Sequence, residues 1–190
     1  DPETGNNFEV GTAGAGREWQ ASLTGFYLML DNEIVYDDAA NLNRNLGSTR
    51  RIGADAMAAL DRVWYGGSTR WTFVDARLEE GTHEGNRVPL VPWAYGTTAL
   101  WLEPVPELRL TATYTYVSKQ YQGNDEANAR RKMEAYGLVG FRANIWMSDL
   151  VSLVFSVDNL LDATYASSAY AGGFYPGAGR NYRVGMKVMF

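Results

Sequence analysis

Hydrophobic and polar side chains alternate along most of this chain, a two-residue period that predicts β-strands. The clearest example is the segment 108–117, where arginine and threonine alternate with Leu108, Leu110, Ala112, Tyr114 and Tyr116. Successive side chains of a strand point to opposite faces, so such a segment has one apolar and one polar face. The pattern predicts an all-β protein with about nine strands, at residues 8–13, 19–30, 50–60, 68–76, 92–102, 108–117, 133–146, 151–158 and 181–190.

The connections between these segments alternate between short and long. The short ones lie at 14–17, 61–67, 103–107 and 147–150. The long ones lie at 31–49, 77–91, 118–132 and 161–180. Outer-membrane β-barrels have short periplasmic turns and long extracellular loops. The alternation therefore predicts antiparallel strands that cross a membrane, with the last strand ending on the periplasmic side.

The faces and ends of the predicted strands differ in composition. We expect Leu110, Leu153, Phe155 and Val184 to face lipid, and a hydrated or plugged lumen to be lined by Arg51, Asp55, Arg109, Thr113, Arg183 and Lys187. Tryptophan lies at the short-turn ends, at Trp19, Trp64, Trp101 and Trp146. Tyrosine lies toward the long-loop ends, at Tyr27, Tyr95, Tyr114, Tyr116, Tyr136 and Tyr182. Because amphipathic rings prefer the headgroup level, we expect two aromatic bands against a bilayer.

The composition excludes several other classes of protein. The 190 residues are 46% hydrophobic and 21% charged, with a net charge of −5. This charge and the absence of a lysine or arginine cluster disfavour a nucleic-acid partner. There is no cysteine for a disulfide or a thiolate metal site. No apolar run approaches the roughly 18 residues of a transmembrane helix.

No catalytic motif is found in the sequence. His83 is the only histidine and lies in a predicted loop beside Glu80 and Glu84, where we interpret it as a solvated residue rather than a metal ligand. A serine nucleophile elbow, Gly-x-Ser-x-Gly, is absent. The sequence Gly14-Ala15-Gly16 lacks the lysine of a phosphate-binding loop and is interpreted as a tight turn. We therefore expect no enzymatic activity, no metal site and no cofactor.

The end of the chain carries two motifs of a known family. Residues 157–165, V-D-N-L-L-D-A-T-Y, resemble the penultimate-strand signature of TonB-dependent outer-membrane receptors. Residues 175–182, Y-P-G-A-G-R-N-Y, resemble the family motif that follows it, and the terminal strand then ends at Phe190. Segments 1–11, 45–55 and 85–92 are similar to earlier motifs, so the resemblance covers essentially the whole chain. It departs at Asp55, where the family usually has glutamate, and at Ala178, where a second proline is common.

The resemblance implies a transmembrane antiparallel β-barrel of roughly 22 strands in the bacterial outer membrane. Such receptors import a ferric siderophore, haem or cobalamin by active transport coupled to TonB. Residues 1–190 are expected to be the carboxy-terminal part of the barrel, without the plug domain. The implied partners are the remainder of the barrel and the plug, TonB through that plug, the barrel-assembly machinery, the lipid bilayer, lipopolysaccharide and a small-molecule ligand. Phe190 is the implied assembly signal.

Ligand contacts are expected from the long loops and the upper lumen wall. Aromatic and amide groups can contact siderophore or haem surfaces, and arginine can pair with anionic groups. The candidates are Tyr121, Asn124, Asp125, Tyr170, Tyr175 and Arg180. Asn159, Asp162 and Arg180 are expected instead to fix loop geometry through local hydrogen bonds.

Two other classes of function stay open at this point. One is a passive porin or a structural outer-membrane barrel without transport. The other is a soluble carbohydrate-binding β-sandwich, in which the apolar face of the sheet would be buried under a second sheet.

Overall fold

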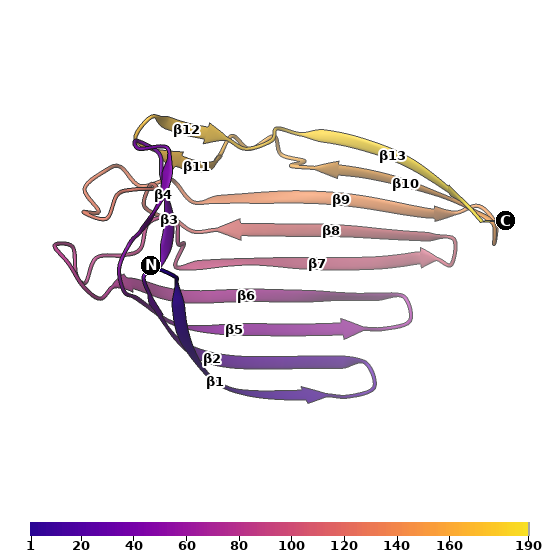
Figure 1. Ribbon diagram of the computed structural model, residues 1–190. Helices are drawn as coiled ribbons and strands as arrows, with labels where there is room; N and C mark the ends of the chain where they lie inside the picture. Colours follow the sequence, from indigo (N-terminus) through magenta and orange to yellow (C-terminus); the bar gives the residue numbers. More distant parts are fainter. Residues whose placement is uncertain (190) are drawn as a thin grey trace.

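The computed structural model describes residues 1–189, and it is a single curved antiparallel sheet with two small hairpins in its loops (Figure 1). Phe190, the predicted assembly signal, lies outside the described residues. The nine strands of the sheet, in spatial order, are β1 (Thr4–Ala15), β2 (Trp19–Asp31), β5 (Thr49–Asp61), β6 (Tyr65–Leu78), β7 (Ala94–Val105), β8 (Leu108–Val117), β9 (Tyr136–Trp146), β10 (Val151–Asp158) and β13 (Asn181–Val188).

All nine predicted strands are present, and β8 and β10 have the predicted bounds. β7 begins at Ala94 rather than Pro92, since proline has no N–H to donate to a ladder. β9 begins three residues later than predicted, because Met133 forms only an isolated bridge with Gln120. The short turns lie at one end of the sheet and the long connections at the other (Figure 1). The predicted alternation of connections is therefore confirmed.

The register of the ladders confirms the predicted strand faces. Leu110 pairs with Ala143, which pairs with Phe155, which in turn pairs with Val184. These residues and Leu153 therefore lie on one face. The predicted polar residues lie on the other, as shown by the row of Thr111, Arg142, Ser156 and Arg183.

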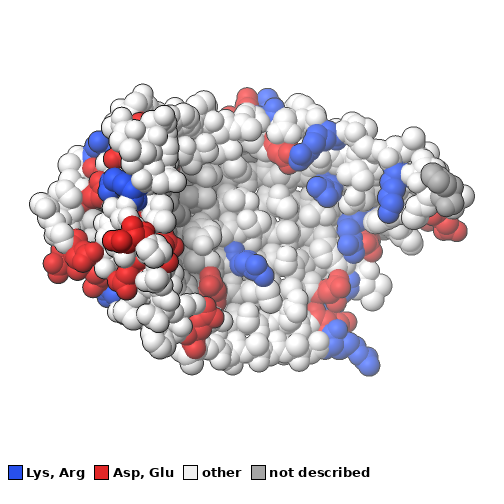
Figure 2. All heavy atoms as spheres, in the orientation of Figure 1, with Lys and Arg blue, Asp and Glu red and all other residues white. Residues whose placement is uncertain are grey.

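The polar face is the hollow side of the sheet. Its members Val74 and Ala76 are buried beneath the loop residues Leu46, Val88 and Val91, which together form the small hydrophobic core. Figure 2 shows this hollowed face, with basic side chains distributed across it and toward the short-turn end. On the convex face, by contrast, Leu100 is 62% exposed and Val184 is 80% exposed. The sheet is thus a wall with an apolar outer surface and a polar inner surface.

The prediction of two aromatic bands on the outer surface is wrong for four rings. These four rings lie on the concave face, because each pairs with a residue of that face. The pairs are Tyr95 with Thr72, Trp101 with Thr111, Tyr136 with Val117 and Trp146 with Ser152. A shift of one residue changes the face of a strand side chain, so closeness to a strand end does not determine which side a ring occupies. Trp101 instead stacks under the guanidinium of Arg109, whose Cζ lies 4.2 Å from the ring centre.

The β-sandwich interpretation is wrong. Within residues 1–189, the other two sheets are two-stranded hairpins and neither covers a face of the wall. They are β3 (Ile34–Asp37) with β4 (Leu42–Asn45), and β11 (Ala166–Tyr170) with β12 (Gly173–Pro176). Both lie in long connections at the loop end, and neither was predicted from the sequence.

Residues 1–189 include no helix with the length and hydropathy needed to span a bilayer.

Candidate functional site

The loop end of the wall is organised by contacts between connections that are distant in sequence. The side chain of Asn124 joins the connection after β8 to the β3–β4 hairpin. Its Nδ2 donates to the Tyr36 carbonyl oxygen over 2.9 Å, and its Oδ1 accepts from the Asp38 N–H over 3.1 Å. Asn124 also has a φ of +57°, a left-handed conformation that asparagine tolerates better than most residues. This predicted ligand residue is thus a structural link between two loops.

Arg44 makes a second link between the same two connections. Its Nε lies 3.1 Å from Asp37 Oδ2 within the hairpin, and its Nη2 lies 2.5 Å from Glu126 Oε1 in the connection after β8. Asp37 Oδ1 also accepts the Ala39 and Ala40 N–H groups. The pKa of Asp37 is lowered from 3.8, first by the hydrogen bond from the Ala40 N–H, and further by those from Ala39 and Arg44. Hence Asp37 is ionised at neutral pH and holds the turn of the hairpin.

Asp125 and Tyr121 lie in the same connection as Asn124 but in different surroundings. Asp125 is buried, and its two carboxylate oxygens accept the Ala129 and Arg130 N–H groups, each over 3.0 Å. It therefore fixes a turn and is not exposed to a ligand. Tyr121 is partly exposed, and Lys132 Nζ lies 4.4 Å from its ring centre.

The β11–β12 hairpin contacts this connection through Tyr170. The Gly123 N–H donates to the Ala169 carbonyl oxygen over 2.7 Å. The Tyr170 ring lies so close to Gly123 that a Cβ there would come within 2.3 Å of Tyr170 Cε1. The Tyr175 ring stands edge-on to Tyr170, with 6.1 Å between centres, and is 50% exposed. The fold thus brings Asn124, Tyr170 and Tyr175 into one neighbourhood.

Arg180 belongs to a separate group at the top of β10 and β13. Its backbone N–H donates to Asp162 Oδ1 over 2.9 Å, and its Nη1 donates to the Leu160 carbonyl oxygen over 3.3 Å. Asn159 Nδ2 donates to the carbonyl oxygens of Ala163 and Ala178, and its Oδ1 accepts the Ala163 N–H. The predicted local hydrogen bonds of these residues are therefore present.

Sequence reasoning missed the ion pairs that secure the β3–β4 hairpin. Glu33 Oε1 lies 2.6 Å from Arg51 Nη2, and Glu33 Oε2 accepts from the Thr49 hydroxyl over 2.5 Å. Arg44 and Glu126 were missed as well. The alternation of Ile34, Tyr36 and Leu42 was a weak signal for the hairpin, but no sequence feature indicates which distant side chains it meets. In Figure 2, acidic side chains gather at the loop end, so the mouth is not uniformly basic.

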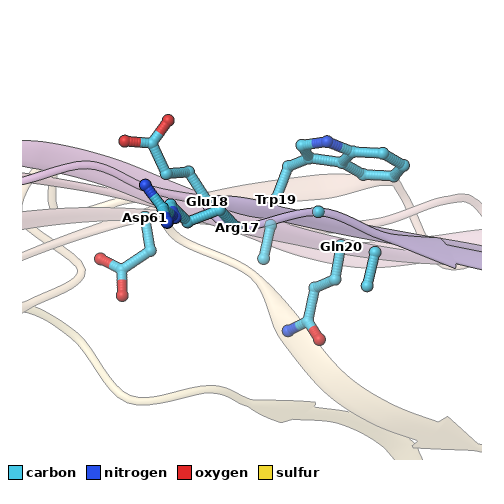
Figure 3. Close-up of a pocket in the computed structure, with 8 residues that line it drawn as sticks. Arg17, Glu18, Trp19, Gln20 and Asp61 are labelled. Carbon is cyan, nitrogen blue, oxygen red and sulfur yellow. The ribbon is translucent and has the colours of Figure 1, made fainter.

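A cavity of about 220 Å³ lies at the opposite end, beside the turn between β1 and β2. Figure 3 shows Trp19 and Gln20 on opposite sides of the strand, and the carboxylates of Glu18 and Asp61 directed away from each other. The turn is closed by a hydrogen bond from the Gly16 N–H to the Trp19 carbonyl oxygen. This geometry is a tight turn, as expected from Gly14-Ala15-Gly16, and the negative charges of Glu18 and Asp61 beside it would repel a phosphate.

His83 lies in the exposed turn after β6. Within residues 1–189, no group of three or more histidine, aspartate or glutamate side chains is arranged to hold a metal ion.

The wall has close structural relatives. It matches the ferric-catecholate import receptor Fiu of E. coli K12 with a TM-score of 0.81 at 18% identity, over 100% of this chain and 28% of that one. It matches the ferric yersiniabactin uptake receptor FyuA of Yersinia pestis with a TM-score of 0.84 at 18% identity, over 99% and 30%. It matches the copper transporter OprC with a TM-score of 0.78 at 16% identity, over 100% and 32%. The chain thus has the fold of one segment of these proteins and spans about a third of their length.

A family model gives the same answer from the sequence. No curated protein sequence matches the chain. The family model described as "TonB dependent receptor-like, beta-barrel" matches residues 1–160. That range includes the eight strands β1 to β10 of the wall, together with the β3–β4 hairpin. The resemblance seen in the motifs is therefore confirmed, and the chain belongs to the TonB-dependent receptor family as part of its β-barrel.

Proposed function

We propose that this chain is part of the barrel wall of an outer-membrane receptor that imports a scarce ligand by TonB-coupled active transport. Members of this family are receptors and transporters of the Gram-negative outer membrane rather than enzymes. The observation that carries the proposal is the family match over residues 1–160, on a curved wall with an apolar convex face and a polar concave face.

The edges of the wall support a larger assembly. Among residues 1–189, β1 pairs only with β2, and β13 pairs only with β10. An unpaired strand edge in hydrocarbon leaves backbone N–H and C=O groups without partners, each at a cost of several kcal/mol. We propose that further strands pair with both edges and that a plug domain fills the hollow. TonB would act through that plug, and the barrel-assembly machinery would insert the strands.

We propose that the ligand is a metal complex, namely a ferric siderophore, haem or cobalamin. The relatives named above are receptors for ferric catecholate and ferric yersiniabactin and a transporter of copper, which supports a metal-containing ligand. Of the six candidate residues, Tyr175 has the most accessible ring, while the side-chain polar groups of Asn124, Asp125 and Arg180 already have protein partners. We propose Tyr175 and its neighbour Tyr170 as ligand contacts.

Uptake by the complete receptor in its native host tests the proposal. The test panel contains radiolabelled ferric siderophores, haem and cobalamin. We expect deletion of the receptor gene to abolish uptake of one of these ligands. Uptake of that ligand should also be lost in a strain without TonB, and should return with the plasmid-borne receptor only when TonB is present.

A passive porin would behave differently in the same strains. Uptake that persists without TonB, together with solute flux through the complete protein in liposomes, would overturn the proposal in favour of diffusion. Tyr175→Ala should raise the ligand concentration needed for half-maximal uptake. Tyr36→Ala in the β3–β4 hairpin is the matched tyrosine control, and it should leave that concentration unchanged.

A further inference from the structure

Three consecutive basic residues, Arg130, Arg131 and Lys132, lie in the connection between β8 and β9. All three are exposed, and none takes part in an ion pair found in residues 1–189. The peptide bond between Arg130 and Arg131 is open as well. Within residues 1–189, neither the Arg130 carbonyl oxygen nor the Arg131 N–H has a hydrogen-bond partner. The basic run thus presents both its charges and its backbone to another molecule.

Adjacent basic residues occur at one other place in the chain, which gives an internal comparison. Arg50 and Arg51 lie in β5, where the backbone pairs with β2 on one side and with β6 on the other. Their side chains pair with Glu79 and Glu33. An enzyme that binds an extended backbone needs the N–H and C=O groups that these ladders already use. Of the two runs, the one at 130–132 is therefore the one that such an enzyme can reach.

Single hydrogen bonds hold the flanks of the basic run. The Arg130 N–H donates to Asp125 Oδ2 over 3.0 Å, and Gln122 Nε2 donates to the Arg131 carbonyl oxygen over 2.7 Å. After the run, the backbone pairs at the isolated bridge of Met133. Breaking these few bonds extends the segment without disturbing a strand of the wall, and such local opening costs far less than global unfolding. Asp125 and Gln122 therefore control how often the run becomes extended.

Residues 123–128, which precede the run, join the other long connections at the loop end. Asn124 binds the β3–β4 hairpin, and the Gly123 N–H binds the β11–β12 hairpin. Asn128 binds the connection after β6, because its Oδ1 accepts the Arg87 N–H over 2.8 Å and its Nδ2 donates to the Arg87 carbonyl oxygen over 2.9 Å. We call residues 123–128 the loop junction. The basic run connects the loop junction to β9.

We propose that the basic run is a cleavage site for an endopeptidase that acts at the cell surface and binds basic side chains in pockets lined by carboxylates. The proposal rests on the outer-membrane location proposed above and adds a regulation of the ligand mouth. At the open bond, the oxygen of a water molecule would bond to the Arg130 carbonyl carbon, and the bond to the Arg131 nitrogen would break. The products are a carboxylate on Arg130 and an ammonium group on Arg131.

Such a cut would release the loop junction from β9. The turn that Asp125 closes onto Arg130 would then be anchored through β8 alone. We expect the β3–β4 and β11–β12 hairpins to lose order, whereas the wall is held by its ladders and stays in the membrane. Cleavage would therefore disorder the mouth without removing the receptor.

The test uses the complete receptor in intact cells of its native host. Trypsin is the probe, because its primary pocket carries an aspartate that binds arginine or lysine. With limiting trypsin, we expect the first cut within residues 1–189 to fall in the run at 130–132, and the bonds after Arg50 and Arg51 to stay intact. Mass spectrometry of the fragments locates each cut. A first cut elsewhere in this chain would overturn the proposal.

A second measurement looks for the cut that the host's own enzyme makes. Outer membranes of untreated cells should contain a receptor fragment that begins at Arg131 or Lys132, identified by labelling of new amino termini. Absence of this fragment would show that the run is accessible to added trypsin only, and would overturn a physiological cleavage site.

Three variants test the role of the run and of its latch. R130Q/R131Q/K132Q should abolish cutting in this segment, while Lys119→Gln, a basic residue of the same connection outside the run, should leave the rate of cutting unchanged. Gln122→Ala frees the Arg131 carbonyl oxygen, so cutting should become roughly 5-fold faster. Unchanged amide hydrogen exchange in β8 shows that each variant folds. A loss of cutting with K119Q, or no acceleration with Q122A, would contradict the proposal.

The cut protein tests the effect on the mouth. Amide hydrogen exchange in the β3–β4 hairpin should accelerate after cleavage, with exchange in β8 unchanged, and equal exchange before and after the cut would exclude a regulation of the mouth. A run that resists trypsin in intact and in permeabilised cells, but is cut in the denatured chain, would overturn this inference alone. Cutting that requires a permeabilised outer membrane would place the loop end inside the cell and would contradict the proposed function itself.

Discussion

The wall of the sheet and its loop end are held together by different interactions. In the wall, neighbouring strands pair through continuous backbone ladders, and the convex side chains, such as Leu100 and Val184, have almost no protein contacts on their outer side. At the loop end, single side chains connect segments more than 80 residues apart, as Arg44 does with Glu126 and Asn124 does with Asp38. The wall therefore depends on a repeating pattern and a bilayer, whereas the loop end depends on a few particular residues.

The largest expected effect comes from placing a charge on the convex face in the middle of the wall. Ala112 lies at the centre of β8 on the convex face, and Thr113 follows it on the concave face. Ala112→Arg should lower the free energy of unfolding of the complete barrel by about 2 to 4 kcal/mol, because the guanidinium meets hydrocarbon. Thr113→Arg, at the same depth, should cost much less. Unfolding in lipid vesicles with denaturant gives both values, and equal losses would contradict the assignment of the faces.

A smaller loss of global stability is expected where the wall passes into the loops, because a change there acts on one connection only. Asn159 is buried, and its side chain makes three hydrogen bonds to backbone groups of residues 163 and 178. Asn159→Ala leaves these groups without partners, and each unsatisfied buried group costs about 1 to 3 kcal/mol. We expect the connection after β10 to become protease-sensitive while the wall stays folded. Asn159→Asp sets a buried carboxylate oxygen against the carbonyl oxygens of residues 163 and 178, so it should increase proteolysis at least as much as alanine does. Unchanged proteolysis of the alanine variant would refute this role.

The Asn124 link between the connections after β2 and β8 should contribute less stability than the hydrogen bonds of Asn159. Asn124→Ala removes the hydrogen bonds to Tyr36 and Asp38, a loss of about 1 to 2 kcal/mol in local stability. Amide hydrogen exchange in the β3–β4 hairpin should accelerate by roughly 5- to 30-fold, with exchange in β8 unchanged. Exposed Asn6→Ala in β1 provides a matched control. Acceleration throughout the wall would show that the loop end and the wall unfold together.

The smallest effect is expected from acid. The folded pKa of Asp37 lies below its ordinary 3.8, mainly because of the Ala40 N–H. A lowered pKa means that Asp37 stabilises the hairpin above pH 3.8, and that this contribution is lost as pH falls from 3.8 through the lower folded value. Hydrogen exchange at Ala39 and Ala40 should therefore accelerate below pH 3.8 in wild type. Asp37→Asn should show no such pH dependence, and a transition at higher pH in both proteins would exclude Asp37 as its source.

The same contrast explains what could be predicted from the sequence. Strand positions and faces could be predicted because the two-residue period of segments such as 108–117 is a local property that the ladder preserves. The fold of the loops could not be predicted, because β3–β4 and β11–β12 are short and are fixed by distant partners such as Glu126 and Gly123. Composition identified Asn124 and Asp125 as polar loop residues but could not indicate that their side chains are used in turns and links.

The aromatic rings show where local reasoning about the wall itself ends. The position of Trp101 near a short turn is evident from the sequence, but its side depends on the register, which places it beside Thr111 and under the Arg109 guanidinium on the concave face. A groove at the rim that Arg87, Lys119 and Lys132 line was not evident from the sequence either. Arg87 follows β6, whereas Lys119 and Lys132 follow β8, and the three side chains meet because these two connections fold over the same rim.

The central claim, that the convex face of this wall contacts lipid, can be measured directly. The chain contains no cysteine, so a single substitution labels one site once any cysteine in the rest of the receptor has been replaced. Leu100→Cys lies on the convex face of β7, and Ala99→Cys lies beside it on the concave face. A fluorophore at position 100 of the complete receptor in bilayers should be quenched by brominated acyl chains and protected from aqueous iodide, while one at position 99 should show little bromolipid quenching. Strong bromolipid quenching at position 99 and strong iodide quenching at position 100 would contradict the account.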